Sequence, residues 1–168
     1  TLDLAPGVSV GVLRHNGFIQ GMGIKEGDPS IVCSQDTRGD QAKGQTAMEN
    51  CLQKSPDINV VYTINEPAAA GAYRALKAAG KDKGVMIVSI DGGCEGVRNV
   101  KAGAIAATSQ QYPLKMAALG VSAGVDYVKT GKRATGYHDT GVTLITDKAM
   151  PGVESKDSKF GLANCWGQ

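Results

Sequence analysis

The hydrophobic positions of this chain follow two patterns that alternate along its length. Continuous apolar runs rich in β-branched residues, at Asn59–Ile64 (NVVYTI) and Val85–Ile90 (VMIVSI), predict strands covered on both faces. In Asp40–Lys54 the apolar residues recur at helical spacing, with Met48 and Cys51 on one stripe, which predicts an amphipathic helix. By the same criteria we expect strands at 1–4, 30–34, 59–64, 85–90, 104–109 and 143–146, and helices at 9–24, 40–54, 66–79, 95–101 and 113–129.

Two parts of this pattern carry further expectations. In the helix expected at 9–24, the spacing of apolar residues predicts a buried face, formed by Val12, Leu13, Ile19 and Met22. The chain from Lys148 onward is polar, and we expect this tail to be irregular up to its last residues, which include a cysteine and a tryptophan.

The order of these elements indicates the fold class. Strand and helix alternate about five times, which favours an α/β fold with a parallel sheet and helices on both faces. Sheets of this kind bind ligands at the carboxyl ends of their strands. The polar residues that directly follow the expected strands are Asp36, Asn65, Asp91, Gln110 and Gln111. The sequence therefore predicts a polar binding site along one edge of the sheet.

Composition narrows the class of protein. At 168 residues and 17.4 kDa the chain has the size of about one domain. Its net charge of +2 lacks the basic excess of a nucleic-acid-binding surface, so no nucleic-acid partner is expected. The longest apolar run falls far short of the ~18 residues that a membrane-spanning helix needs. Glycine is abundant, with 23 residues, and no repeat organises these glycines, so we assign them to turns and close backbone contacts.

The four cysteines, Cys33, Cys51, Cys94 and Cys165, leave two interpretations open. They form no C-x-x-C pair and neither histidine has metal-ligand spacing, so no metal site is expected. An even number at wide spacing suits the disulfides of an exported protein, but buried free thiols are an equal alternative. If disulfides form, we expect Cys33–Cys51, which joins a strand to the next helix, and Cys94–Cys165, which ties the C-terminal tail to the loop after a strand.

No motif for enzymatic chemistry is complete in this chain. Residues 120–124 (GVSAG) match the G-x-S-x-G motif of hydrolases, but they follow a helical segment rather than a strand, so Ser122 is not expected to be catalytic. There is no G-x-x-x-x-G-K-[ST] loop, and no G-x-G-x-x-G sequence opens a helix after a strand, so no cofactor is expected. His15 fits a polar surface or cleft position better than the role of a general base.

Two short segments at the expected edge have both a structural and a functional interpretation. The NEP segment at 65–67 suits a helix start, because asparagine is a favoured N-cap and proline fits the first turn. The DGG segment at 91–93 suits a turn that ends a strand. Because the two segments follow consecutive buried strands, their side chains share one rim, and we favour a binding role for Asn65 and Asp91.

Three segments resemble the sugar-binding proteins of ABC importers, which have the type I periplasmic binding protein fold. They are INEPAAAGAYRALKAAG, VSIDGGCEGVRNVKAGAIAATSQQYPLKMAALGV and DTGVTLITDK with the CWG ending. Within them, DGGCEGV, ATSQQYP and the ending are most similar to the fructose-binding branch. The resemblance extends over essentially the whole chain. It implies an exported periplasmic protein without enzymatic activity, which binds a monosaccharide and presents it to a membrane permease.

The resemblance also implies a set of sugar ligands. The positions that match the sugar ligands of the family's second lobe are Arg14, Asn65, Asp91 and Gln111. A carboxylate can accept hydrogen bonds from neighbouring sugar hydroxyls, while a guanidinium and carboxamides supply fixed donors. The loop at 34–40 (SQDTRGD) lacks the aromatic residue that relatives stack on the sugar. Asp36 and Arg38 in this loop are further candidates, which would supply polar contacts instead.

Proteins of this family have two lobes joined by three crossovers, and the resemblance places this chain in the second lobe. It implies that residues 1–111 belong to that lobe and that 138–168 return to it as a strand and tail. Residues 112–137 are expected to pack on a first lobe upstream of Thr1, or to form a homo-oligomer through the helix at 113–129. Hinges are expected near Gln111–Tyr112 and His138–Thr140.

An alternative function shares this fold. The effector-binding core of a LacI-type transcription regulator has the same architecture. Free thiols and an upstream helix-turn-helix are expected of a regulator, whereas paired disulfides are expected of an exported binding protein.

Overall fold

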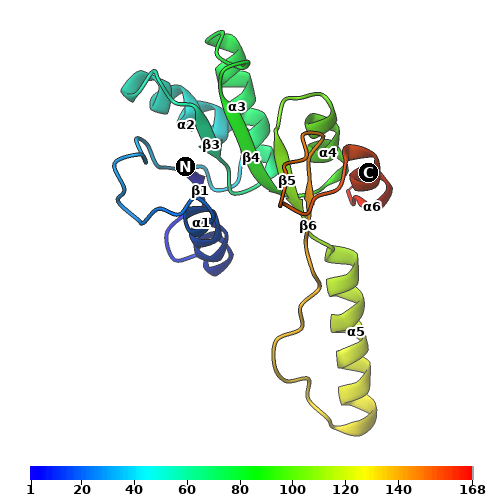
Figure 1. Cartoon of the computed structure of the whole chain (residues 1–168). Helices are drawn as coiled ribbons and strands as arrows, with labels where there is room; N and C mark the ends of the chain where they lie inside the picture. Colours follow the sequence, from blue (N-terminus) through cyan, green and yellow to red (C-terminus); the bar gives the residue numbers. More distant parts are fainter. Residues whose placement is uncertain (168) are drawn as a thin grey trace.

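Strands and helices alternate along the chain, as its hydrophobic pattern predicts (Figure 1). The computed structural model describes residues 1–167. In chain order the elements are β1 (Leu2–Asp3), α1 (Ser9–Gly21), β2 (Gln35–Asp36), α2 (Gln41–Lys54), β3 (Val60–Tyr62), α3 (Glu66–Ala78), β4 (Met86–Asp91), α4 (Cys94–Lys101), β5 (Ala107–Gln110), α5 (Pro113–Thr130), β6 (Thr143–Ile145) and α6 (Ser158–Asn164). The expected α/β class is confirmed.

The strands lie side by side in the order β2-β1-β3-β4-β5-β6. Strands β1 and β2 form one ladder and β3 to β6 another, and a bridge between Leu2 and Thr63 joins the two. All these pairings are parallel except the last, because β6 runs antiparallel to β5. The chain leaves the sheet after β5, forms α5 and returns to the same edge of the sheet, rather than crossing over to the other edge. Strand β6 therefore starts at the edge where the parallel strands end.

Different helices cover the two faces of the sheet. Side chains alternate along a strand, so Val61 and Tyr62 of β3 point to opposite faces. Val61 belongs to the buried core that α2, α3, α4 and α6 cover, with Met48 and Leu76 among its members. Tyr62 instead stacks on Phe18 of α1, with ring centroids 4.6 Å apart. Helices therefore flank the sheet on both sides, and α1 lies on the face opposite to α2, α3, α4 and α6.

Helices α2 and α3 approach each other closely through two glycines. A Cβ at Gly71 would lie 2.0 Å from the Gln41 carbonyl oxygen, and one at Gly44 would lie 2.7 Å from the Ala68 carbonyl oxygen. Any larger residue at either position would push the two backbones apart. This close packing fixes the start of α3, and with it Asn65, against the end of β3.

Two expectations about local structure are wrong. The second strand lies at Gln35–Asp36 rather than at 30–34, because its ladder partner β1 pairs with these two residues. The tail after Lys148 is not irregular throughout, since α6 forms within it. Its N-cap Asp157 accepts a hydrogen bond from the Phe160 N–H at 2.8 Å. A helix of seven residues is too short to show a clear hydrophobic period.

The buried face expected on α1 is also wrong. Val12, Leu13 and Met22 are 47%, 72% and 49% exposed, and only Ile19 of the expected set is buried. Among residues 1–167, α1 is the one helix on its face of the sheet. Most of its apolar side chains therefore have no neighbouring helix to cover them and remain exposed. The same face leaves Met86 of β4 49% exposed.

Helix α5 and the chain that returns from it extend away from the rest of the structure (Figure 1). None of its residues is buried. Leu114, Val121 and Val128 are 76%, 68% and 85% exposed, and their spacing of seven residues places them on one face of the helix. No helix in residues 1–167 has both the length and the apolar character needed to cross a membrane.

The structure pairs Cys33 with Cys51 and Cys94 with Cys165, the two pairs that the sequence predicts. The Cα atoms are 5.6 Å apart in the first pair and 4.9 Å apart in the second, distances that suit disulfides. The first bridge ties the segment before β2 to α2, and the second ties the C-terminal tail to the first turn of α4.

We therefore expect denatured, unreduced protein to expose no reactive thiol. Bridges that close loops of 18 and 71 residues restrict the unfolded chain. They stabilise the fold by about 3 and about 4 kcal/mol in the chain-entropy account. Thiol titration in denaturant, before and after reduction, tests the pairing, and chemical unfolding of both forms measures the stabilisation. Four reactive thiols before reduction would contradict the pairing.

Candidate functional site

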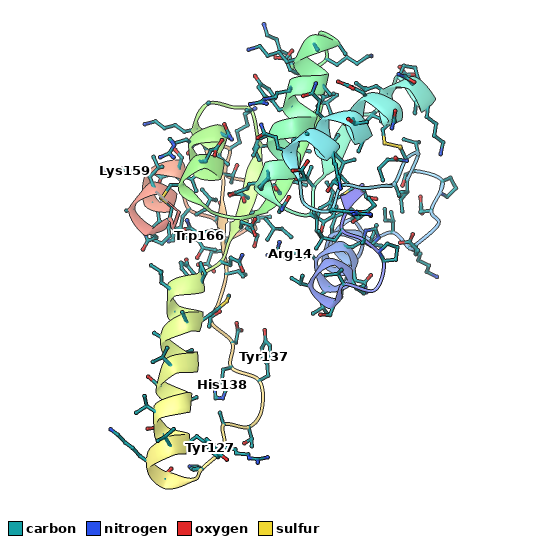
Figure 2. All side chains as sticks on the ribbon, turned by 180° about the vertical axis from the view of Figure 1, so that it is seen from behind. Arg14, Tyr127, Tyr137, His138, Lys159 and Trp166 are labelled. Atoms are coloured by element: carbon teal, nitrogen blue, oxygen red, sulfur yellow. A yellow bond between two sulfur atoms is a disulfide. The ribbon has the colours of Figure 1, made fainter. Side chains whose placement is uncertain are left out.

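Three of the expected binding residues meet at the carboxyl edge of the sheet. Asp91 is the last residue of β4, and its Oδ1 accepts a hydrogen bond from Nη2 of Arg14 at 3.0 Å and one from Nε2 of Gln111 at 3.0 Å. Arg14 comes from α1, where its Nη1 also donates to the Ile64 carbonyl oxygen at 2.9 Å. Figure 2 shows Arg14 at the edge of the sheet from which α5 departs. The fold thus brings Arg14, which is 77 positions from Asp91 in the sequence, and Gln111, which is 20 positions away, to the same carboxylate.

Asn65 lies at the same edge but serves the fold as well. Its Oδ1 accepts from the Ala68 N–H at 3.1 Å and so caps α3, and its Nδ2 donates to the Gly39 carbonyl oxygen at 2.9 Å. An amide has two N–H groups and two lone pairs on its oxygen, so one of each is still available to a ligand. The structural interpretation of the NEP segment is therefore correct, and it leaves the binding role open.

Asp36 at the end of β2 and Arg38 in the loop that follows are both exposed, and neither is hydrogen-bonded to this cluster. The carboxylate of Asp36 accepts from the N–H of Arg38 at 2.7 Å, which stabilises the loop. Gln110, another residue that directly follows an expected strand, is fully buried. Its Nε2 donates to the carbonyl oxygens of Gly92 and Gly161, so it packs inside the fold while its neighbour Gln111 faces the edge.

The cluster has the polar groups that a polyhydroxylated ligand needs. Oδ1 of Asp91 accepts hydrogen bonds from the side chains of Arg14 and Gln111, and each carboxylate oxygen can accept more than one. Arg14 uses two of its five N–H groups in the bonds described. At such a site the carboxylate can accept a hydrogen bond from one hydroxyl while the free guanidinium N–H groups donate to its neighbour. Charge-assisted hydrogen bonds of this kind are worth roughly 1.5 to 3 kcal/mol each.

Partial burial sets the electrostatics of this pair. The side chains of Arg14 and Asp91 are 18% and 13% exposed. Burial raises the pKa of the Asp91 carboxyl above its ordinary value, while the charge and hydrogen bond of Arg14 and the amide of Gln111 oppose the rise. The ion pair with Arg14 therefore favours the charged form of Asp91 at a position where burial disfavours it.

Glu66 is a buried carboxyl group behind the cluster that the sequence did not single out. Its two oxygens accept hydrogen bonds from the N–H groups of Gly92 and Gly93 at 2.9 and 3.0 Å and from the hydroxyl of Thr108 at 2.7 Å. Gly96 makes room for it, since a Cβ there would lie 1.8 Å from Cδ of Glu66. Glu66 therefore holds the turn that follows Asp91.

We expect Glu66 to make folding stability depend on pH. Burial raises its pKa from 4.5 to about 7, although the Thr108 hydroxyl and the Gly92 and Gly93 N–H groups oppose the rise. The folded state then keeps a proton between these pH values that the unfolded state has lost, so stability falls as pH increases from about 4.5 through about 7. The fall attributable to Glu66 is about 3 kcal/mol.

Urea unfolding at pH 5 and pH 8, with wild-type protein and E66Q, measures this effect. His15 titrates in the same range, so the difference between the two proteins isolates Glu66. E66Q is expected to be less stable at pH 5 and to lose most of the fall between the two pH values. An equal fall in both proteins would show that Glu66 is not its source.

His15 joins two acidic residues near Arg14. Its Nδ1 lies 2.8 Å from Oδ1 of Asp3, and its Nε2 lies 2.9 Å from Oε2 of Glu26. Burial lowers the pKa of His15, but the hydrogen bonds to Glu26 and Asp3 outweigh it and raise the pKa above its ordinary value. This agrees with the expected polar cleft position rather than with a general base.

The remaining motif adds no chemistry to the site. Ser122 lies in the middle of exposed helix α5, without the strand-turn-helix geometry that a nucleophile elbow requires. Across residues 1–167, no group of three or more His, Cys, Asp or Glu side chains is arranged to hold a metal ion.

Comparison with known proteins gives this arrangement its context. Residues 4–133 match the family model described as a periplasmic binding protein domain. The chain is 34% identical over 139 residues to the ribose import binding protein of Salmonella typhimurium, a match that covers 83% of this chain and 46% of that protein. The chain belongs to the periplasmic binding protein family.

Other members of the family give similar matches. The D-allose-binding periplasmic protein of Escherichia coli is 34% identical over 126 residues, which cover 75% of this chain and 40% of that protein. The crystal structure of a galactofuranose binding protein superposes with a TM-score of 0.80 at 27% identity, over 96% of this chain and 53% of that chain. A Caulobacter myo-inositol binding protein, bound to myo-inositol, gives a TM-score of 0.77 at 28% identity, over 87% and 50%. This chain thus spans about half the length of the curated relatives it matches.

Proposed function

We propose that this chain is the second lobe of a substrate-binding protein of an ABC-type sugar importer. The complete protein would enclose a fructose- or ribose-like monosaccharide between two lobes and present it to a membrane permease. No covalent chemistry is involved, so the protein is a binding protein and not an enzyme. The residues proposed to bind the sugar from this lobe are Arg14, Asn65, Asp91 and Gln111.

The cluster of Arg14, Asp91 and Gln111 is the observation that carries this proposal. It combines a carboxylate acceptor with free guanidinium donors at the carboxyl edge of a parallel sheet. Relatives named for binding ribose, allose and myo-inositol, all small polyhydroxylated molecules, support a ligand of this class. Asp36 and Arg38 remain proposed only as outer contacts, since both are exposed and lie apart from the cluster.

The two places where the chain leaves and re-enters this lobe support a hinge. Helix α5 begins at Pro113, directly after Gln111–Tyr112, and the returning chain reaches β6 at Thr143. The Tyr112 hydroxyl bonds to Oγ1 of Thr143, and Nζ of Lys115 donates to the Thr140 carbonyl oxygen at 3.1 Å. The two segments are thus joined by hydrogen bonds at the ends of α5 and β6, and element ends of this kind are where hinges occur. We assign 1–111 and 138–168 to the second lobe and 112–137 to the contact with the first.

Exposed apolar surface supports a first lobe outside the present sequence. Helix α5 carries an apolar face that nothing in residues 1–167 covers, and α1 with Met86 leaves one face of the sheet partly bare. Patches of this kind are uncommon on monomers and mark surfaces that pack against something else. Because the relatives are about twice as long, we propose that their other half has a counterpart that covers these surfaces.

The disulfides favour export over the regulator alternative. Two bridges among four cysteines suit an oxidising compartment such as the periplasm, whereas a LacI-type regulator works among reduced thiols. Titration calorimetry on the complete two-lobed protein, against a panel of aldopentoses, aldohexoses and fructose, tests the proposal. Saturable binding of one sugar is expected. Absence of binding to every sugar in the panel by folded, two-lobed protein would overturn it.

A further inference from the structure

Asp91 has a backbone conformation that needs external support. Its φ is 141°, in the region that favours glycine, so the residue carrying the central carboxylate is strained. Strained residues persist when the surrounding structure over-determines them, and they occur often at ligand sites. The direction of the Asp91 side chain therefore depends on what holds the turn that follows it, from Asp91 to Cys94.

Every main-chain polar group between the Asp91 carbonyl and the Cys94 N–H has a partner. Glu66 accepts from the N–H groups of Gly92 and Gly93, and Gln110 donates to the Gly92 carbonyl oxygen. The carbonyl oxygen of Gly93 accepts a hydrogen bond from the Val97 N–H in α4. These partners belong to helices and strands of the core, so they hold the turn from the inside.

Trp166 holds the same turn from the outside, at both of its ends. Its indole Nε1–H donates to the Asp91 carbonyl oxygen at 3.3 Å, and its own carbonyl oxygen accepts from the Cys94 N–H at 2.9 Å. The second bond satisfies one of the donors that the start of α4 leaves unpaired. Figure 2 shows Trp166 at the same edge of the sheet as Arg14.

The Cys94–Cys165 disulfide fixes this contact. Cys165 directly precedes Trp166, and Cys94 is the residue whose N–H the tryptophan carbonyl accepts. The bridge therefore places the indole by a covalent bond to the turn it supports. The tail after α6 has no element beyond it in residues 1–167, so the disulfide is the covalent tie that keeps Trp166 in place.

We infer that Trp166, held by the Cys94–Cys165 disulfide, is a positioning residue that sets the direction of the Asp91 carboxylate. The inference rests on the proposed function, in which this carboxylate binds the sugar. The Gln111 N–H also donates to the Asp91 carbonyl oxygen, at 3.0 Å, so removing the indole N–H or the bridge weakens the support of the turn without abolishing it. The Asp91 side chain can then turn away from Arg14 and Gln111. The site then loses affinity while the core remains folded.

Carbon-13 NMR of the carboxyl groups in the 168-residue chain tests the inference without any ligand. Burial raises the pKa of Asp91 while Arg14 and Gln111 oppose the rise, so a carboxylate that moves away from these two partners is expected to titrate at a changed pKa. W166F keeps an aromatic ring and removes only the donor, and C94A/C165A removes the bridge. C33A/C51A is the matched control, because it removes a bridge that stabilises the fold away from this edge.

The expected result is a changed Asp91 pKa and shifted Gly92 and Gly93 amide signals in W166F and C94A/C165A, but not in C33A/C51A. In the two-lobed protein, the first two variants should bind sugar about three- to tenfold more weakly, the range for loss of one hydrogen bond. An unchanged Asp91 titration in W166F, or an equal change in C33A/C51A, would overturn the inference. If the wild-type protein binds no sugar, the proposed function fails while the NMR comparison still decides the role of Trp166.

Discussion

Replacing Asp91 by alanine is expected to abolish sugar binding by the complete two-lobed protein, with affinity reduced at least about a hundredfold. The variant removes the carboxylate proposed to accept from sugar hydroxyls and leaves Arg14 without its ionic partner at 3.0 Å. Two charge-assisted hydrogen bonds lost at roughly 1.5 to 3 kcal/mol each account for a change of this size. Asp91 is not a member of the hydrophobic core, so folding should be retained.

Titration calorimetry with the sugar selected by the wild-type protein measures the loss. D57A is a matched control, because Asp57 is exposed before β3, at the end of the strands opposite to Asp91. Thermal unfolding of both variants checks that they are folded. Wild-type affinity in folded D91A would remove Asp91 from the site, and with it the main support for the proposed function.

The other ligands are expected to matter in a definite order. R14A should cause a loss close to that of D91A, because the two charges act as a pair. N65A and Q111A should cause smaller losses, since each removes a neutral amide. N65A should also lower stability by about 1 kcal/mol, because it deletes the cap of α3. Equal losses in all these variants would point to a general disturbance of the edge rather than to separate ligand contacts.

The purified 168-residue chain is expected to self-associate rather than remain at its monomer mass of 17.4 kDa. The apolar face of α5, formed by Leu114, Val121 and Val128, faces water along its whole length. Burying a large aliphatic side chain is worth about 1.5 to 3 kcal/mol, so covering several of them is comparable with the stability of a small domain. In the complete protein we propose that the first lobe covers this face, and in its absence a second copy should.

Light scattering coupled to size-exclusion chromatography measures the mass. V121K/V128K places charges on the apolar face of α5 and is expected to shift the chain toward monomer. M150K is the control, because Met150 is 68% exposed outside α5. A stable wild-type monomer at high concentration, with α5 ordered and facing solvent, would show that the lobe assignment is wrong.

Much of the fold follows from the sequence because it depends on local pattern. The apolar, β-branched runs at 59–64 and 85–90 predict strands, and parallel strands place their carboxyl ends at one edge. That rule by itself is enough to bring Asn65 and Asp91 to the same rim. The same rule places Gln111 there, whereas Arg14 was named only from the family resemblance, and the structure shows the bonds that join both residues to Asp91.

Tertiary structure alone decided which polar residues face the edge and which support it from behind. Gln110 and Gln111 are adjacent and chemically identical, and only the register of β5 turns one into the core and the other to the rim. Glu66 resembles any first-turn glutamate in sequence, yet packing places it under the Gly92–Gly93 turn. Trp166 reaches Asp91 from 75 residues away. Such contacts depend on how distant segments are brought together, which no local pattern of residues contains.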